Sequence, residues 1–365
     1  MSRLPRPLSM QAQSDVALLR GRAHLRLGET TDARTQFSLA LRERPVDARL
    51  GLAQSAAAEG DAISADKLME EILAVAPESA ESWVFRGDLL RSEGKSEEAL
   101  AAYRKAAILQ PANVSARKML AATLLRKEQP QSATYVLEPL LAQPTDDAEL
   151  LSLAGQAYLQ IGQVRKALQF LERAVALDPA NARIRTSLGL TRLAGGERRL
   201  AVDDLEAAVA LKATDTRAEN YLIMALVARG ETSKALQAAQ ALEQKQPNKS
   251  VTHLLKGAVF LAQQDFVRAR ASFERSLALQ PAYFPAAAAL AQIDLREKNA
   301  EAARGRMEGV LKHDKKNLDA MLALAKFEFD AGRRSEAVAR LRQAQSEHPQ
   351  ALQPVPLVYW TPTSP

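Results

Sequence analysis

The chain has no cysteine, few aromatic residues and no long apolar run. The absence of cysteine excludes disulfides, thiolate zinc sites and cysteine nucleophiles, and it leaves the redox compartment open. Because no window of about 18 consecutive apolar residues occurs, we expect no transmembrane segment. Residues 1–10 lack the apolar stretch of a signal peptide. The chain as written is therefore expected to be cytoplasmic, and a periplasmic or envelope-associated location is the alternative if an export signal has been lost.

Sequence signatures of catalysis and of cofactor binding are also missing. The histidines lie in different stretches of the chain without a second ligand at a metal-binding spacing. Neither a P-loop nor a dinucleotide-binding glycine turn occurs. Adjacent acidic residues such as Glu70 and Glu71 point about 100° apart on a helix, so they do not converge on one substrate. We therefore expect no enzyme activity, no catalytic residue, no cofactor and no metal.

Charge of neither sign is gathered in one block. Lys and Arg outnumber Asp and Glu by 49 to 43, which gives a net charge of +6, but the two signs alternate along the chain. This pattern favours a solvated surface, and the alternative is a basic surface that binds nucleic acid.

The residues that dominate, alanine and leucine, favour helices, and they recur with a period. At 365 residues the chain is too long for one ordinary compact core, which a repeat array avoids. Proline or a substitute recurs about every 34 residues, at Pro45, Pro77, Pro111, Pro144, Pro179, Ala213, Pro247, Pro281, Lys315 and Pro349. Small residues keep the same spacing, at Ala33, Ala65, Ala99, Ala133, Ala167, Ala201, Ala235, Ala269, Ala303 and Ala337.

Each period contains two stretches of apolar residues spaced three and four apart, which predicts a pair of amphipathic helices. Glycines in one register are expected to end the first helix with a positive φ, and the prolines are expected to end the second. These glycines are Gly28, Gly94, Gly162, Gly196, Gly230 and Gly332. We predict an N-terminal extension over 1–13, ten repeats over 14–351 and a Pro-rich apolar tail over 352–365. The predicted repeats are 14–47, 48–79, 80–113, 114–147, 148–181, 182–215, 216–249, 250–283, 284–317 and 318–351.

Two of these units carry a family resemblance. Their characteristic residues are Trp83, Gly87, Gly94, Ala99, Tyr103, Ala106 and Pro111 in one unit, and Gly155, Tyr158, Gly162, Ala167, Ala174 and Pro179 in the other. With this spacing the chain resembles tetratricopeptide-repeat proteins over residues 14–351. The resemblance implies an all-α, right-handed superhelical solenoid of about ten helix-turn-helix repeats, which acts as a non-enzymatic scaffold for protein-protein interaction.

A narrower resemblance rests on three short runs, LAATLLR at 120–126, VLEPLL at 136–141 and PAYFPAA at 281–287. They are similar to the PrsT tetratricopeptide proteins of bacterial PEP-CTERM/exosortase systems. This resemblance implies a role in bacterial envelope or exopolysaccharide biogenesis, or in PEP-CTERM protein sorting.

The expected binding surface is the concave face that the first helices line in such an array. One register on these helices is apolar throughout: Leu125, Leu159, Leu193, Val227, Leu261, Leu295 and Phe329. This strip either binds an extended or helical partner segment or packs between adjacent first helices. Polar candidates on the same face are Arg22, Lys118, Arg126, Gln156, Arg183, Asn220, Gln292, Arg296 and Lys326. They either grip the carboxylates of a partner or form a solvated surface.

Two further interpretations stay open. The chain is a candidate for the substrate-recognition arm of a larger enzyme assembly, as an alternative to a scaffold that binds a protein or peptide. At the C-terminus, Val355, Leu357, Val358, Tyr359 and Trp360 are apolar. We expect them to fold back over the last hairpin, and the alternatives are a flexible tail or the remnant of a truncation.

Overall fold

The computed structural model describes residues 9–211 and 216–349. These residues form twenty α-helices and no β-strand, so the prediction of an all-α solenoid of helical hairpins is confirmed. The helices belong to two compact units, an N-terminal unit (Met1–Pro179) and a C-terminal unit (Ala180–Pro365). We call the odd-numbered helices first helices and the even-numbered ones second helices.

The N-terminal unit contains α1 (Met10–Leu27), α2 (Thr30–Ala40), α3 (Pro45–Ala58), α4 (Ala62–Val75), α5 (Ala80–Ser92), α6 (Ser96–Leu109), α7 (Val114–Arg126), α8 (Pro130–Leu141), α9 (Ala148–Gln160) and α10 (Val164–Leu177). The C-terminal unit contains α11 (Ala182–Ala194), α12 (Arg198–Ala210), α13 (Arg217–Arg229), α14 (Thr232–Lys245), α15 (Ser250–Ala262), α16 (Phe266–Leu279), α17 (Phe284–Arg296), α18 (Ala300–His313), α19 (Leu318–Asp330) and α20 (Arg334–Glu347).

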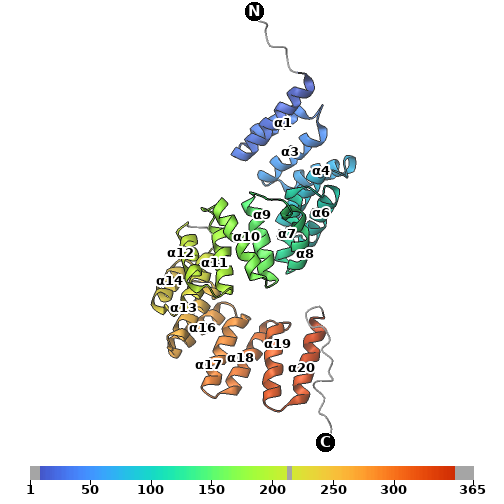
Figure 1. Cartoon of the computed structure of the whole chain (residues 1–365). Helices are drawn as coiled ribbons and strands as arrows, with labels where there is room; N and C mark the ends of the chain where they lie inside the picture. Colours follow the sequence, from blue (N-terminus) through green and yellow to red (C-terminus); the bar gives the residue numbers. More distant parts are fainter. Residues whose placement is uncertain (1–8, 212–215, 350–365) are drawn as a thin grey trace, which may run out of the picture. The chain divides into compact units, whose positions relative to one another are not determined.

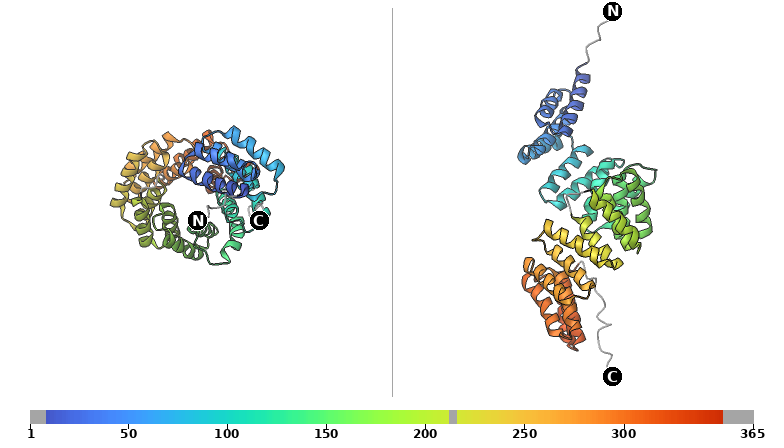
Figure 2. Two further views of the ribbon diagram at one scale, coloured as in Figure 1. Left: turned by 90° about the horizontal axis from the view of Figure 1, so that it is seen from above. Right: turned by 90° about the vertical axis from the view of Figure 1, so that its left-hand side faces the viewer.

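Within each unit, consecutive helices contact each other and the hairpins lie side by side, as Figures 1 and 2 show. Several first helices also contact the first helix of the next hairpin, for example α5 with α7 in the N-terminal unit and α13 with α15 in the C-terminal unit. Among the described residues, the extensive helix–helix contacts join neighbouring hairpins, which is the local pattern expected of a repeat array.

Polar side chains begin several first helices. The side-chain oxygens of Asn113, Asp147, Asn181 and Asn317 accept hydrogen bonds of 2.9–3.2 Å from the backbone N–H three residues on. Each such cap satisfies one of the N–H groups that a helix start leaves without a partner, and contributes about 1 kcal/mol.

Two helices begin earlier than the predicted repeat boundaries. Ser9 caps α1 by accepting from the N–H of Ala12 at 3.2 Å, so α1 starts at Met10, inside the predicted extension 1–13. Pro45 lies after the end of the second helix α2, as predicted, and it is itself the first residue of α3. Proline is tolerated there because the first N–H of a helix has no intrahelical partner to lose.

The turn glycines adopt the predicted conformation. Gly28, Gly94, Gly162, Gly196, Gly230 and Gly332 have φ between 77° and 80°, which confirms the expected left-handed end of the first helices. In three hairpins the same turn is made by Glu128, Gln264 and Lys298, with φ between 56° and 62°. A side chain in this region costs about 1–2 kcal/mol, so these three turns carry backbone strain.

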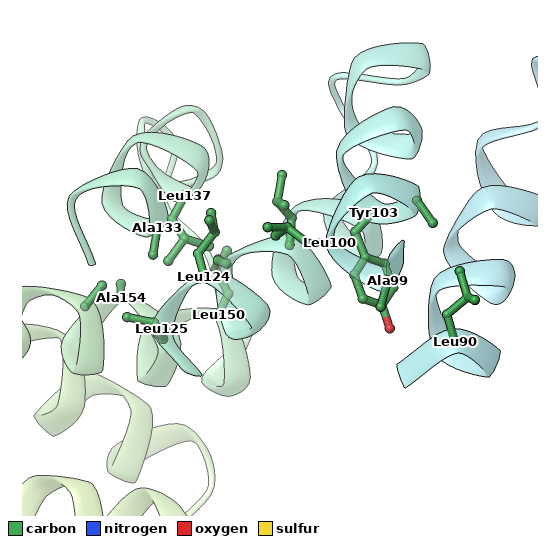
Figure 3. Close-up of a cluster of buried hydrophobic side chains, with 14 residues drawn as sticks. Leu90, Ala99, Leu100, Tyr103, Leu124, Leu125, Ala133, Leu137, Leu150 and Ala154 are labelled. Carbon is green, nitrogen blue, oxygen red and sulfur yellow. The ribbon is translucent and has the colours of Figure 1, made fainter. Parts of the chain in front are cut away.

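The alanines that recur with the repeat lie at close contacts between helices. Every alanine of the 34-residue register is at most 1% exposed. Larger side chains fill the space between the helices of a hairpin: in α6, Tyr103 lies over Gly87 of α5, where an added Cβ would come within 2.5 Å of the ring. Figure 3 shows Tyr103 with Leu124, Leu137 and other members of the largest buried cluster of the N-terminal unit.

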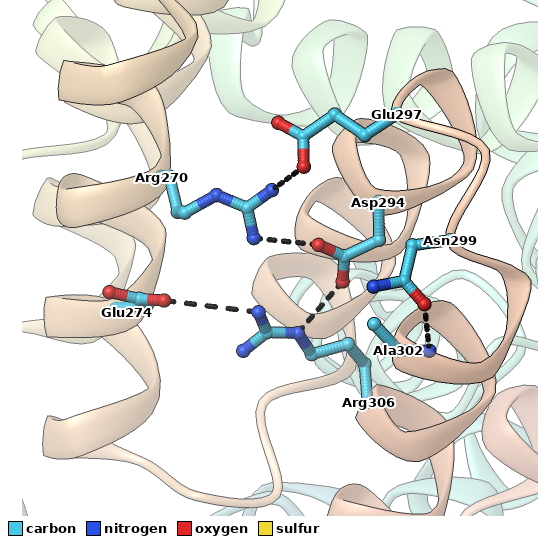
Figure 4. A network of polar contacts seen from close by, with 7 residues as sticks. All are labelled: Arg270, Glu274, Asp294, Glu297, Asn299, Ala302 and Arg306. Carbon is cyan, nitrogen blue, oxygen red and sulfur yellow. Dashed lines mark hydrogen bonds and ion pairs between the residues drawn. The ribbon is translucent and has the colours of Figure 1, made fainter.

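A buried polar network joins three helices of the C-terminal unit (Figure 4). Asp294 of α17 is 2% exposed and accepts hydrogen bonds from Arg270 of α16 at 2.6 Å and from Arg306 of α18 at 3.0 Å. Glu297 lies 2.8 Å from Arg270, and Glu274 lies 3.8 Å from Arg306. Burial raises the pKa of Asp294, but the hydrogen bonds from the two arginines outweigh burial and hold the pKa below its ordinary value.

The predicted tail 352–365 and its fold-back over the last hairpin lie outside the described residues. Among the described helices, none combines the length and the apolar character needed to cross a lipid bilayer.

Candidate partner-binding groove

The predicted apolar strip lies on the first helices and changes in exposure along the chain. In the N-terminal unit, Leu125 of α7 is 7% exposed and belongs to the buried cluster of Figure 3, and Leu159 of α9 is half-buried. In the C-terminal unit, Leu193 and Val227 pack against the core beside α13, and Leu261 packs against the core beside α15. At these positions the strip therefore contributes to packing.

Two members of the strip are open to solvent. Leu295 of α17 is 45% exposed and Phe329 of α19 is 42% exposed. The accessible part of the strip is thus concentrated in the last two hairpins of the C-terminal unit.

Most polar candidates of the N-terminal unit are engaged within the protein. Lys118 lies 3.0 Å from Asp147 and 2.5 Å from Glu149, with its side chain 14% exposed. Burial lowers the pKa of Lys118, but hydrogen bonds to the two carboxylates outweigh burial and raise the pKa above its ordinary value. Lys118 therefore joins α7 to the start of α9 rather than presenting a cation to a partner.

The remaining polar candidates of this unit make a long ion pair or hydrogen bonds to uncharged side chains. Arg22 lies 3.7 Å from Glu81, and both side chains are about half exposed. Arg126 donates to the hydroxyl of Thr123 at 3.1 Å. The side-chain amide of Gln156 donates to the hydroxyl of Ser152 at 3.1 Å.

The polar candidates of the C-terminal unit occupy different environments. Arg183 and Gln292 are exposed, and Oδ1 of Asn220 is buried without a hydrogen-bond partner among the described residues. Arg296 lies over the ring of Phe266, 4.3 Å from its centroid.

A cleft brings several of the predicted residues together. It has a volume of about 390 Å³ and lies between α17 and α19, with α18 contributing to its wall. Leu295, Gln292 and Lys326, all predicted from sequence, line this cleft. A smaller neighbouring cleft of about 270 Å³ is lined by Leu261, Gln292 and Arg296. The structure thus gathers five predicted residues from α15, α17 and α19 along one stretch of the C-terminal unit.

Other lining residues were missed by the sequence reasoning. Phe284, Ala288, Met307 and Phe327 form much of the apolar wall of the α17–α19 cleft. The available signal was the alanine-rich start of α17, because small side chains leave a hollow where the preceding hairpin has larger residues such as Leu254.

One possible metal-ligand group is also new. His24, Glu29 and Asp32 meet at the turn between α1 and α2, with ligand atoms within 4.8 Å of one another. Nδ1 of His24 lies 2.6 Å from the Glu29 carboxylate, so a side-chain hydrogen bond within the turn accounts for this contact. Sequence spacing did not reveal the group because the turn, rather than one helix face, brings the three residues together.

Comparisons with known proteins agree with this architecture. Models of the tetratricopeptide repeat match residues 52–189, residues 294–354, and the two stretches 18–65 and 186–250. No curated protein sequence matches the chain.

Two solved structures illustrate the similarity. A tetratricopeptide-repeat protein from Parabacteroides merdae has a TM-score of 0.54 and 17% identity, covering 64% of this chain and 93% of that one. The human IFIT1 dimer with m7Gppp-AAAA has a TM-score of 0.54 and 18% identity, covering 90% of this chain and 80% of that one. At such identities the likeness concerns the fold.

Proposed function

Because the chain is a tetratricopeptide-repeat protein, we propose that it is a non-enzymatic scaffold that binds a segment of a partner protein on its first helices. The observation that supports this proposal is the apolar cleft of about 390 Å³ between α17 and α19, which contains Leu295, Gln292 and Lys326. Concave apolar surfaces with a few polar groups at the rim are typical of peptide-binding sites.

The cleft also indicates where the proposal is best tested. Charges at Leu159, Leu193 or Val227 would be forced into half-buried packing positions and would cost stability as well as binding. Leu295 is 45% exposed, so Leu295→Glu places a charge in the cleft with little effect on the core. Leu177 of α10 is 43% exposed and does not line this cleft, which makes Leu177→Glu the matched control.

The experiment captures partners from lysate of the source cell with the unaltered protein and the two variants, after circular dichroism has checked that all three are equally helical. We expect a set of proteins that the unaltered chain and Leu177→Glu retain and Leu295→Glu loses. If Leu295→Glu retains the same proteins, the cleft is not the binding surface.

The identity of the captured molecules separates the alternatives. A captured enzyme whose substrate binds to this chain would favour a substrate-recognition arm. Nucleic acid whose binding falls steeply with salt would favour the basic surface instead. Because proteins of the PEP-CTERM or exopolysaccharide machinery would be named by the same capture, it also tests the narrower sequence resemblance at 120–126, 136–141 and 281–287.

A further inference from the structure

The α17–α19 cleft presents an apolar surface without a net charge. Phe284, Ala288 and Phe327 contribute to its wall, and its charged residues are Lys326 and Asp330. These two side chains pair with each other at 2.9 Å, so the rim offers neither a free cation nor a free anion. Figure 1 shows α17 and α19 with α18 in the same part of the C-terminal unit. A segment without charged side chains matches this surface best.

Such a segment is present in this chain. Residues 350–365 contain no Asp, Glu, Lys or Arg, in a chain whose composition is 25% charged. Residues 355–360 read VPLVYW and include the aromatic pair Tyr359 and Trp360. Pro354, Pro356 and Pro362 disfavour a helix and favour an extended backbone, which is the form that fits along a groove.

The point at which the described chain ends lies within reach of the cleft. Nε2 of His348 contacts the backbone oxygen of Lys316 at 2.5 Å, and Glu347 lies 2.9 Å from the Lys316 ammonium. The chain therefore leaves α20 beside the start of α19, about 14 Å along the helix from Phe327. From Pro349, an extended backbone spans about 20 Å to residue 355 and about 36 Å to residue 360.

We propose that residues 355–360 occupy the α17–α19 cleft in the isolated protein and compete there with the partner segment. This inference rests on the proposed function, since it assigns the same cleft a second occupant. A tethered segment is present at an effective concentration in the millimolar range, so even a weak fit keeps the cleft filled. A partner must then displace the tail, which restricts binding to partners with a better fit.

Tryptophan fluorescence tests the proposal directly. The chain has two tryptophans, Trp83 and Trp360, so Trp83→Phe leaves Trp360 as the single reporter in the full-length protein. We expect Trp360 to emit at shorter wavelength and to be quenched less by acrylamide than free N-acetyltryptophanamide. Adding Leu295→Glu is expected to shift the emission to longer wavelength and to increase quenching, and adding Leu177→Glu is expected to leave both unchanged.

Three results would overturn the proposal. If acrylamide quenches Trp360 in Trp83→Phe as strongly as it quenches free N-acetyltryptophanamide, the tail is not docked. A shielded Trp360 that Leu295→Glu does not expose is docked elsewhere, as over the outer face of α20. Shielding that disappears on dilution indicates the tail of a second copy.

The two proposals fail separately. One outcome is that Leu295→Glu loses its partners while Trp360 is fully accessible to acrylamide in Trp83→Phe, which keeps Leu295. The scaffold proposal then holds and tail docking fails. If tail docking holds, a chain ending at residue 349 is expected to bind the captured partner more tightly than the full chain. If Leu295→Glu exposes Trp360 but still captures the same partners, the tail binds in the cleft and the partner binds at another surface.

Discussion

Replacing Asp294 by Asn is expected to destabilise the C-terminal unit by about 2–3 kcal/mol. The exchange keeps the volume of the side chain but removes the charge that pairs with Arg270 and Arg306. Breaking a fully buried ion pair costs about 3–5 kcal/mol. The two arginine side chains are 26% and 27% exposed, and they keep Glu297 and Glu274 as partners, so water and these carboxylates offset part of the loss.

Hydrogen exchange measures this effect where it arises. A loss of about 2–3 kcal/mol corresponds to roughly 30- to 150-fold faster exchange of the slowest amides in α17. Asp203→Asn is the control, because Asp203 is 52% exposed and lies 3.7 Å from Arg199 on the same helix. We expect that control to change stability by less than about 0.5 kcal/mol.

The pH dependence adds a second check on Asp294. Its pKa in the folded protein lies below the ordinary value of 3.8, so its contribution is present above that value and is lost as the pH falls through the folded pKa. The difference between the unaltered protein and Asp294→Asn should therefore shrink below about pH 3.8. Equal exchange in α17 for Asp294→Asn and Asp203→Asn at neutral pH would refute the role assigned to the network.

Three further outcomes are expected. Gly257→Ala places a Cβ 2.5 Å from the ring of Phe273 and should lower the urea midpoint by an amount equivalent to about 1–3 kcal/mol, and an unchanged midpoint would contradict the close packing. Gln264→Gly relieves a residue with φ of 61° and should raise stability by about 0.5–1 kcal/mol in the same assay, whereas a decrease would show that the side chain contributes more than the strain costs. Burial and the hydrogen bond to Asp88 raise the pKa of Tyr103 to about 12, so ultraviolet titration that compares the unaltered protein with Tyr103→Phe should show that this phenol ionises near pH 12. Because the unfolded chain releases that proton near its ordinary pKa of 10.0, stability should fall as the pH rises from 10 toward 12, and a Tyr103 that titrates at the ordinary value would remove this effect.

The sequence predicted the hairpin architecture because each determinant acts within one period. The positive φ of a turn glycine such as Gly162 depends only on the local backbone. The burial of an alanine such as Ala167 depends only on the neighbouring helix that packs against it. Prolines mark helix boundaries without giving their direction: Arg44 before Pro45 lies outside the α region, as expected, and Pro45 itself starts α3.

The binding surface was predicted only in part. Sequence registers identify which residues lie on the first helices, and Leu295 and Gln292 were found in this way. These registers do not give the distance between neighbouring first helices. That distance decides whether a leucine is buried, as Leu125 is, or exposed, as Leu295 is. Lys118 was misleading for a related reason, because the residues that neutralise it, Asp147 and Glu149, belong to the next hairpin.

The ion pairs between arginine and a buried carboxylate also affect how a repeat protein of this kind can gain or lose whole repeats. Arg270 pairs with Asp294 across one hairpin junction, and Arg304 lies 3.3 Å from Glu328 across the next. Both partners in the second pair stand 34 residues after their counterparts in the first. Removing residues 284–317 would place Arg270 opposite Glu328, and duplicating them would place a further arginine opposite a further acid. Deleting or duplicating a whole repeat in this part of the C-terminal unit would therefore keep each buried carboxylate paired with an arginine. An insertion of any other length would leave a buried charge without its partner.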